Sequence, residues 1–89
     1  MTELEVAIKN RAGLHTRPAA TLVKLASKYK SDFFIYKDGI EINGKSIIGV
    51  MTLAAERGST LSLRFDGPDE TEAADAMREL FDRGFDEPM

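Results

Sequence analysis

The chain has no cysteine, and at 89 residues this absence constrains how it can fold. Neither a disulfide framework nor a cysteine metal site can stabilise it. A chain of this length buries only roughly 60–65% of its unfolded surface, so its core has to be compact and its elements regular. We therefore expect one domain over residues 1–89, held together by packing alone, as in a cytoplasmic protein.

The composition excludes several functional classes. Apolar residues make up 43% of the chain and charged residues 30%, which is typical of a folded globular domain. The net charge of −3 argues against binding of nucleic acid, which needs a basic surface. Residues 1–5 lack the apolar core of a secretion signal, and no apolar run approaches the roughly 18 residues that cross a bilayer. We expect a cytoplasmic protein without membrane insertion.

Hydrophobic periodicity predicts seven elements in the order β-α-β-β-α-β-α. Alternating or β-branched segments predict strands over residues 4–8, 33–37, 40–42 and 61–65. Helical spacing predicts a first helix from positions 15–18 to near Tyr29. It also predicts a short helix after Ser46 as N-cap, and a last helix that ends at Gly84. We expect an α+β fold with a mostly antiparallel sheet under the helices, followed by a loose tail over 85–89.

The most informative stretch is Gly-Leu-His-Thr-Arg-Pro at residues 13–18. His15 is the only histidine in the chain, and it lies between a strand-ending glycine and the predicted helix start. Free N–H groups in a first helical turn carry partial positive charge and bind anions. Arg17 adds a cation that can contact phosphate oxygens in a bidentate manner. Phosphoryl transfer needs mainly positioning and charge stabilisation, so a site this small is sufficient for a phosphohistidine.

The residues alone leave three interpretations of this stretch open. His15 can accept a phosphoryl group, belong to a simple anion site, or be an ordinary surface residue at a helix start. A binding or structural domain that uses the helix N-terminus without chemistry predicts that His15→Ala leaves function intact. A phosphoryl carrier predicts that the same substitution abolishes function.

Two motifs resemble those of a known family. Residues 13–20 resemble the active-site motif of HPr, the phosphocarrier of the bacterial phosphotransferase system. Residues 44–51 resemble the second signature of the same family, around its regulatory serine. The order of the elements also matches, and the resemblance covers essentially the whole chain. It implies the HPr-like open-faced β-sandwich, with three helices on one face of a four-stranded sheet. It also implies a phosphotransfer component rather than a stand-alone enzyme. We expect no cofactor, and no metal, because one histidine and scattered carboxylates do not make a metal site.

The resemblance assigns roles to the residues around the histidine. It implies that enzyme I phosphorylates His15 on Nδ1, with phosphoenolpyruvate as the original donor, and that enzyme IIA-type proteins accept the group. Arg17 matches the arginine that contacts the phosphoryl group, and Thr16 and Arg17 would supply backbone N–H donors. Pro18 fixes the helix start and gives up an N–H that has no intrahelical partner.

Ser46 has two compatible interpretations. It is a plain N-cap, and it also matches the serine that HPr kinase/phosphorylase modifies in many bacteria. A phosphate at a helix N-terminus is electrostatically favourable, so the modification would not unfold the helix. We expect it instead to weaken the binding of enzyme I by repulsion and desolvation.

Adjacent apolar residues predict an exposed patch. Ile47 and Ile48 cannot both point inward on one narrow helical stripe. The resemblance implies a docking patch for enzyme I and the acceptors, made by Ile47, Ile48 and Met51 with Thr16, Ala20 and Lys24. Transient interfaces of this kind favour apolar contact with a charged rim. We expect a monomer, because docking to several partners needs a free face.

The branch of the family and the role of the carrier stay open. The residues of the loop 10–12 and the ending 82–87 resemble NPr and related branches, whereas the Ser46 region resembles members regulated by the kinase. Sugar uptake and a regulatory phosphorelay are both compatible with this mixture. A second class of function is a regulatory binding module, whose phosphorylation state selects its partner without net carriage. We expect the carboxylates at 69–72 to interact with the helix dipole, and Asp82, Asp86 and Glu87 to be solvated.

Overall fold

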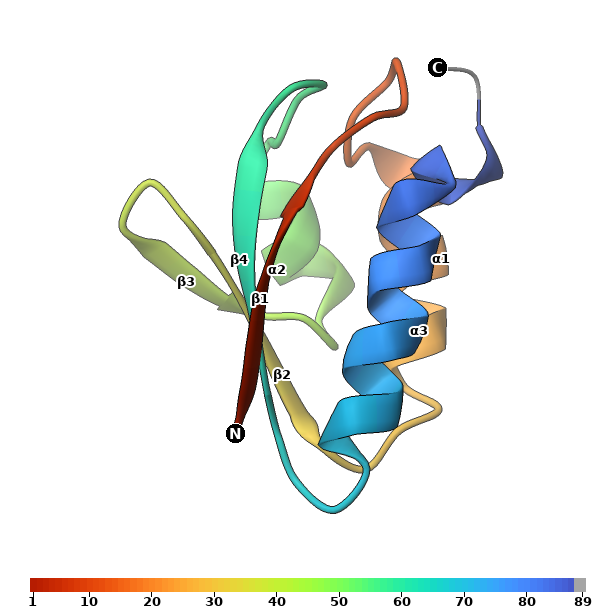
Figure 1. Cartoon of the computed structure of the whole chain (residues 1–89). Helices are drawn as coiled ribbons and strands as arrows, with labels where there is room; N and C mark the ends of the chain where they lie inside the picture. The colour runs from red at the N-terminus through yellow and green to blue at the C-terminus, as the bar shows by residue number, and fades with distance from the viewer. Residues whose placement is uncertain (88–89) are drawn as a thin grey trace.

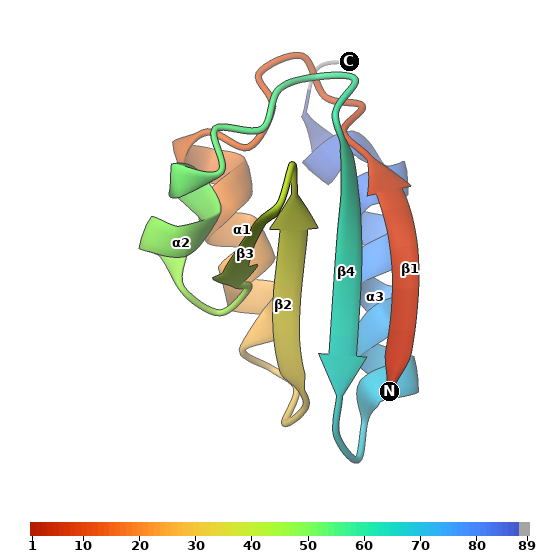
Figure 2. The ribbon, with the colours of Figure 1, turned by 90° about the vertical axis from the view of Figure 1, so that its left-hand side faces the viewer.

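A computed structural model describes residues 1–87 as a four-stranded antiparallel sheet covered by helices (Figure 1). The strands lie in the order β1-β4-β2-β3, so β1 and β4 pair although they are far apart in the sequence (Figure 2). Their bounds are β1 (Thr2–Ala7), β2 (Asp32–Lys37), β3 (Ile40–Asn43) and β4 (Thr60–Asp66). The predicted α+β class and antiparallel sheet are confirmed.

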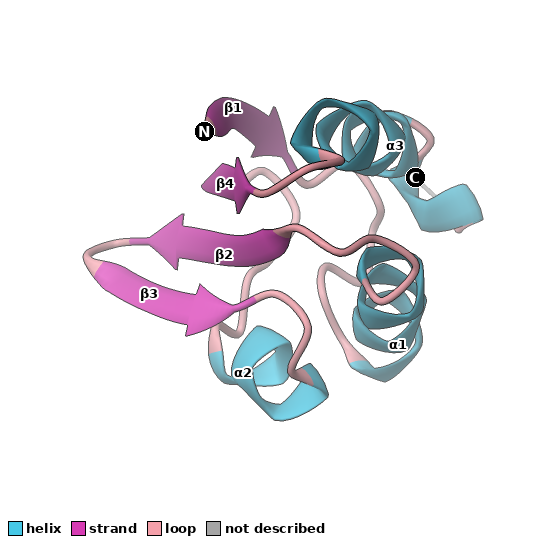
Figure 3. Ribbon diagram, turned by 90° about the horizontal axis from the view of Figure 1, so that it is seen from below, coloured by secondary structure: helices cyan, strands magenta, loops and turns pink. Residues whose placement is uncertain are grey.

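The helices lie on one side of the sheet and leave its other face open (Figure 3). Their bounds are α1 (Thr16–Ala26), α2 (Ile47–Thr52) and α3 (Glu70–Asp82), followed by a 3-10 turn, η1 (Gly84–Asp86). This arrangement is the predicted open-faced sandwich. α1 begins at the end of the molecule where α3 ends, which brings residues near 15 close to residues near 87 (Figure 1).

The core forms because the strands alternate as the sequence predicts. Leu61, Leu63 and Phe65 on β4 point under the helices and are buried, while Ser62 between them is exposed. Phe33 is the cross-strand partner of Phe65, and the two rings stack with their centroids 4.5 Å apart. The stripe predicted on the last helix is buried as expected: Ala73, Met77, Leu80 and Phe81.

Two helix boundaries test the sequence prediction. α1 ends at Ala26, three residues before the predicted end near Tyr29. The amides of Lys28 and Tyr29 bond to carbonyls three residues back, so a tighter turn replaces the last helical turn. Ser46 is the N-cap of α2 as predicted, because its hydroxyl accepts a hydrogen bond from the Gly49 amide at 3.2 Å.

The prediction of a loose tail after Gly84 was wrong for the residues that the structure describes. Gly84 ends α3 with a left-handed φ of 62°, as a glycine in that position commonly does. Phe85 and Asp86 are also left-handed, so the chain turns back over α3. Phe85 is only 5% exposed and packs edge-on against Phe81 at 4.9 Å. Burial of this ring fixes the turn. Residues 88–89, also in the predicted tail, lie outside the described part.

Candidate functional site

A tight loop between β1 and α1 presents His15. Gly13 has a φ of +70°, and a Cβ built on it would lie 2.5 Å from the Ala55 carbonyl oxygen. The next residue, Leu14, is buried, and its amide donates to the same Ala55 carbonyl at 3.0 Å. Gly13 is therefore required both for its left-handed backbone and for close approach to the loop after α2.

His15 stands at the start of α1 with its side chain free. It is the N-cap, in an extended conformation, and its carbonyl accepts the first helical bond from the Ala19 amide at 2.8 Å. The imidazole makes no capping hydrogen bond and is exposed. The amides of Thr16 and Arg17 lie in the first turn, where no intrahelical acceptor is available, and Pro18 has no N–H. These features are the ones that the predicted anion site at a helix N-terminus requires.

Arg17 extends from the first turn toward the C-terminal segment. Its Nε lies 3.7 Å from Oε2 of Glu87, and its side chain is 86% exposed. The Glu87 side chain is only 14% exposed, which corrects the prediction that it is solvated surface. The left-handed turn over Phe85 explains the difference, because it carries Glu87 back to the start of α1. Sequence periodicity gives no signal for a turn of this kind.

Ser46 lies at the N-terminus of α2, in a turn that is tied to the chain just after α1. The neighbouring Lys45 ammonium donates to the Tyr29 carbonyl at 2.7 Å. Lys45 and Ser46 are both partly exposed. The hydroxyl of Ser46 serves the helix as its cap, and the serine remains partly accessible at the surface.

The predicted apolar patch is exposed and spans two neighbouring helices. Ile48 on α2 is 76% exposed, and Ile47 and Met51 are exposed to lesser degrees. α1 and α2 pack against each other (Figures 2 and 3). Three exposed residues on α1 repeat every four positions and so share one face of that helix: Thr16, Ala20 and Lys24. The structure thus brings the six predicted patch residues onto adjoining helices and starts the α1 face beside His15.

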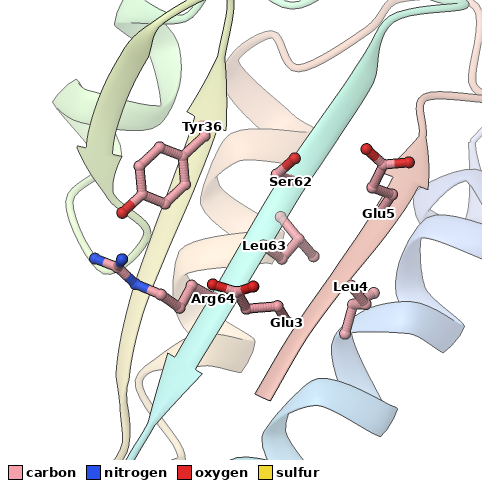
Figure 4. Close-up of a pocket in the computed structure, with 7 residues that line it drawn as sticks. All are labelled: Glu3, Leu4, Glu5, Tyr36, Ser62, Leu63 and Arg64. Carbon is pink, nitrogen blue, oxygen red and sulfur yellow. The ribbon is translucent and has the colours of Figure 1, made fainter. Parts of the chain in front are cut away.

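A separate hollow lies on the open face of the sheet and contains none of the predicted site residues (Figure 4). Glu3 and Glu5 on β1 face Arg64 and Ser62 on β4 across the ladder. Arg64 leans the other way, with its guanidinium carbon 5.0 Å from the centre of the Tyr36 ring. Cation–π contact and a 3.5 Å ion pair to Glu41 therefore hold it at β2 and β3.

The carboxylates at the start of α3 do more than interact with its dipole. Asp69 accepts hydrogen bonds from the Ser31 hydroxyl and from the amides of Lys30 and Ser31, and these lower its pKa to about 2. Glu70 accepts from the Thr2 hydroxyl at 2.7 Å and also binds the Met1 ammonium, and these contacts lower its pKa to about 2. The pair fixes β1 and the start of β2 to α3, at the end of α3 opposite Glu87.

Two negative findings apply to the described part of the chain. Residues 1–87 contain no group of three or more histidine or carboxylate side chains placed to hold a metal ion. No helix within that range is both long enough and apolar enough to cross a membrane.

Comparison with known proteins assigns the chain to a family. Residues 2–83 match the profile described as the PTS HPr component phosphorylation site. Phosphocarrier protein HPr of Treponema pallidum is 48% identical over 82 residues, covering 92% of this chain and 93% of that protein. A crystal structure of HPr from Thermoanaerobacter tengcongensis superposes with a TM-score of 0.96 at 42% identity and full coverage of both chains. A crystal structure of an HPr dimer from the same organism superposes with a TM-score of 0.77 at 42% identity, with 96% of this chain and 98% of that chain covered.

The fold and the site together define a small open-faced α+β protein with a free histidine at a helix N-terminus. The chain belongs to the HPr family of the phosphotransferase system, as its resemblance predicted. Its relatives in this family are phosphocarrier proteins and not stand-alone enzymes.

Proposed function

We propose that this chain is a histidine phosphocarrier that accepts a phosphoryl group on His15 and passes it to another protein. The observation that carries the proposal is the free imidazole of His15 at the N-terminus of α1, next to Arg17 and the first-turn amides. The donor is phospho-enzyme I, charged from phosphoenolpyruvate, and the acceptors are enzyme IIA-type proteins. Either sugar uptake or a regulatory phosphorelay would use this chemistry, in the cytoplasm.

The chemistry follows from the residues at the start of α1. Nδ1 of the neutral imidazole attacks phosphorus, and a nitrogen–phosphorus bond forms as the bond to the donor breaks. The transferred group brings its negative charge into the field of the Thr16 and Arg17 amides. Arg17 can turn from Glu87 to the phosphoryl oxygens, because an ion pair this exposed contributes little stability. Donation to an acceptor is the reverse displacement.

Partner docking is assigned to the apolar patch. Ile47, Ile48 and Met51 are exposed on α2, and α2 packs against α1. The exposed face of α1 that begins at Thr16 starts next to His15, so we expect a partner seated on both helices to reach the imidazole. Lys24 at the rim would favour an acidic partner surface. We expect the protein to work as a monomer, because this patch has to stay free.

Ser46 is proposed as a regulatory phosphorylation site for HPr kinase/phosphorylase. Its hydroxyl is partly accessible, and it lies one residue from the patch. A phosphate there would introduce charge at the rim of the docking surface without opposing the α2 dipole. Phosphorylation of His15 in a Ser46→Asp variant at the wild-type rate would contradict this role.

A regulatory binding module is the second candidate, and the position of Ser46 beside the patch favours it. In that role the state of His15 or Ser46 would select a partner without net transfer.

Labelling from phosphoenolpyruvate in the presence of purified enzyme I tests acceptance at His15. We expect acid-labile, alkali-stable label on the wild type and none on His15→Ala. No label on the wild type, with an enzyme I that is active on another carrier, would rule the proposal out.

A further inference from the structure

Asn10 occupies an unusual position in the loop that leads to His15. Its side chain is fully buried (0% exposed), and among residues 1–87 the only other buried polar or charged side chain is that of Ser31. The Asn10 Nδ2 donates to the Gly13 carbonyl at 2.8 Å. In the opposite direction, the Gly13 amide donates to the Asn10 carbonyl at 3.3 Å. Two hydrogen bonds between the same two residues therefore close the loop just before the histidine.

The closed loop has one further attachment before the helix. Gly13 lies against the Ala55 carbonyl, and the Leu14 amide donates to that carbonyl at 3.0 Å. Leu14 is buried, so its side chain also anchors the loop in the core. His15 is the next residue, and its backbone direction is set by how Gly13 and Leu14 are held.

Stability alone does not explain why asparagine occupies this position, because one of its two polar side-chain atoms is unpaired within the described part of the chain. Its Oδ1 is buried and accepts no hydrogen bond from the described residues. A buried acceptor without a partner is costly, and an apolar side chain at this position would avoid that cost. The benefit of the amide is thus its single bond to the Gly13 carbonyl.

We propose that Asn10 is a positioning residue for phosphoryl transfer at His15. Its bond to Gly13 holds the loop so that the imidazole and the first-turn amides of Thr16 and Arg17 face the same point. Asn10 acts only through Gly13 and Leu14. The inference rests on the proposed function, because it concerns the rate of that transfer.

The test compares Asn10→Leu and Asn10→Ala with the wild type. Asn10→Leu keeps the number and branching of the side-chain heavy atoms and removes both the donor and the unpaired acceptor, whereas Asn10→Ala removes both without adding bulk. An effect shared by the two variants therefore comes from the lost hydrogen bond. Ser31→Ala is the matched control, because Ser31 is also a buried polar residue but binds Asp69 at the start of α3. The measurements are kcat and KM for transfer from phospho-enzyme I, and hydrogen exchange at the Leu14 amide.

We expect kcat to fall about tenfold or more in both Asn10 variants, since small misplacements of reacting groups have effects of this size. KM for phospho-enzyme I should stay within about twofold, because the apolar patch is untouched. The substitutions are expected to change only where the reacting groups lie. Exchange at Leu14 should accelerate about tenfold relative to amides of β4, by opening of the local loop. Ser31→Ala should change neither kcat nor this exchange ratio.

Undiminished kcat in both Asn10 variants would overturn the inference, whether or not Leu14 exchange accelerates. Loss of kcat in Ser31→Ala to the same extent would also overturn it, because the effect would then be one of general stability. Absence of label on the wild type would remove the proposed function and this inference together. If the wild type is labelled but kcat is the same in the Asn10 variants, only this inference fails and the proposed function stands.

Discussion

At the scale of single residues, the site depends on backbone conformations that few side chains allow. Gly13 is left-handed and pressed against the Ala55 carbonyl, and Phe85 and Asp86 are left-handed without being glycine. Non-glycine residues in this region cost of the order of 1 kcal/mol each and persist only when packing compensates. Here the buried Phe85 ring compensates, and the result is that Glu87 reaches Arg17.

Substitution of Gly13 tests the loop. Gly13→Ala should lower the free energy of unfolding by about 2–4 kcal/mol, because a left-handed alanine is strained and its Cβ would overlap Ala55. Gly39→Ala is the control, since Gly39 is also left-handed but has nothing within 4 Å of a Cβ. It should cost only about 1 kcal/mol. Urea unfolding measures both, and equal losses would show that contact with Ala55 is unimportant.

Substitution of Glu87 tests whether its ion pair with Arg17 keeps the guanidinium from binding phosphate. Glu87→Gln should release the guanidinium and raise the affinity for inorganic phosphate about two- to fivefold at low salt, the range expected for an exposed ion pair. The shift of the Thr16 amide resonance on titration with phosphate measures this affinity. Asp86→Asn removes a neighbouring carboxylate that pairs with Arg83, and it should leave the affinity unchanged. Weaker phosphate binding by Glu87→Gln would contradict the account.

At the scale of elements, α3 is held at both ends by contacts that sequence patterns do not predict. At its start, Asp69 binds the chain before β2 and Glu70 binds β1. At its end, the turn η1 returns the chain to α1. These contacts join α3 and the turn after it to β1, to α1 and to the chain before β2, none of which is next to α3 in the sequence. One end of α1 carries the proposed site.

The acidic contacts predict how stability depends on pH. The pKa of Asp69 and that of Glu70 are each about 2 in the folded protein, against an ordinary value near 4 in the unfolded chain. The unfolded state therefore binds protons first as the pH falls, and the stabilisation present above about pH 4 is lost toward pH 2. We expect Tm to fall steeply over this interval and less steeply in Asp69→Asn. The control Asp82→Asn removes an exposed carboxylate and should keep the wild-type profile. An Asp69→Asn profile identical to the wild type would contradict this assignment.

At the scale of the whole molecule, the sequence predicts those features of the fold and the site that follow from local periodicity or from a short motif. The strands, the buried stripe of α3, the cap at Ser46 and the exposure of Ile48 all follow from spacing that short segments reveal. The sequence misses contacts that depend on the tertiary fold, such as Glu87 with Arg17 and Asp69 with Ser31. It also misses the burial of Asn10, although asparagine at the first position and glycine at the fourth are typical of a β-turn, which the bond from the Gly13 amide to the Asn10 carbonyl closes here.

Onward transfer is the most direct test of the claim that the protein is a carrier. Protein labelled on His15 would be purified and mixed with an enzyme IIA-type acceptor, and the label on each protein would be followed with time. We predict that the label leaves this chain and appears on the acceptor. Label that stays on His15, with an acceptor that takes label from another carrier, would contradict the carrier role and support a regulatory binding module.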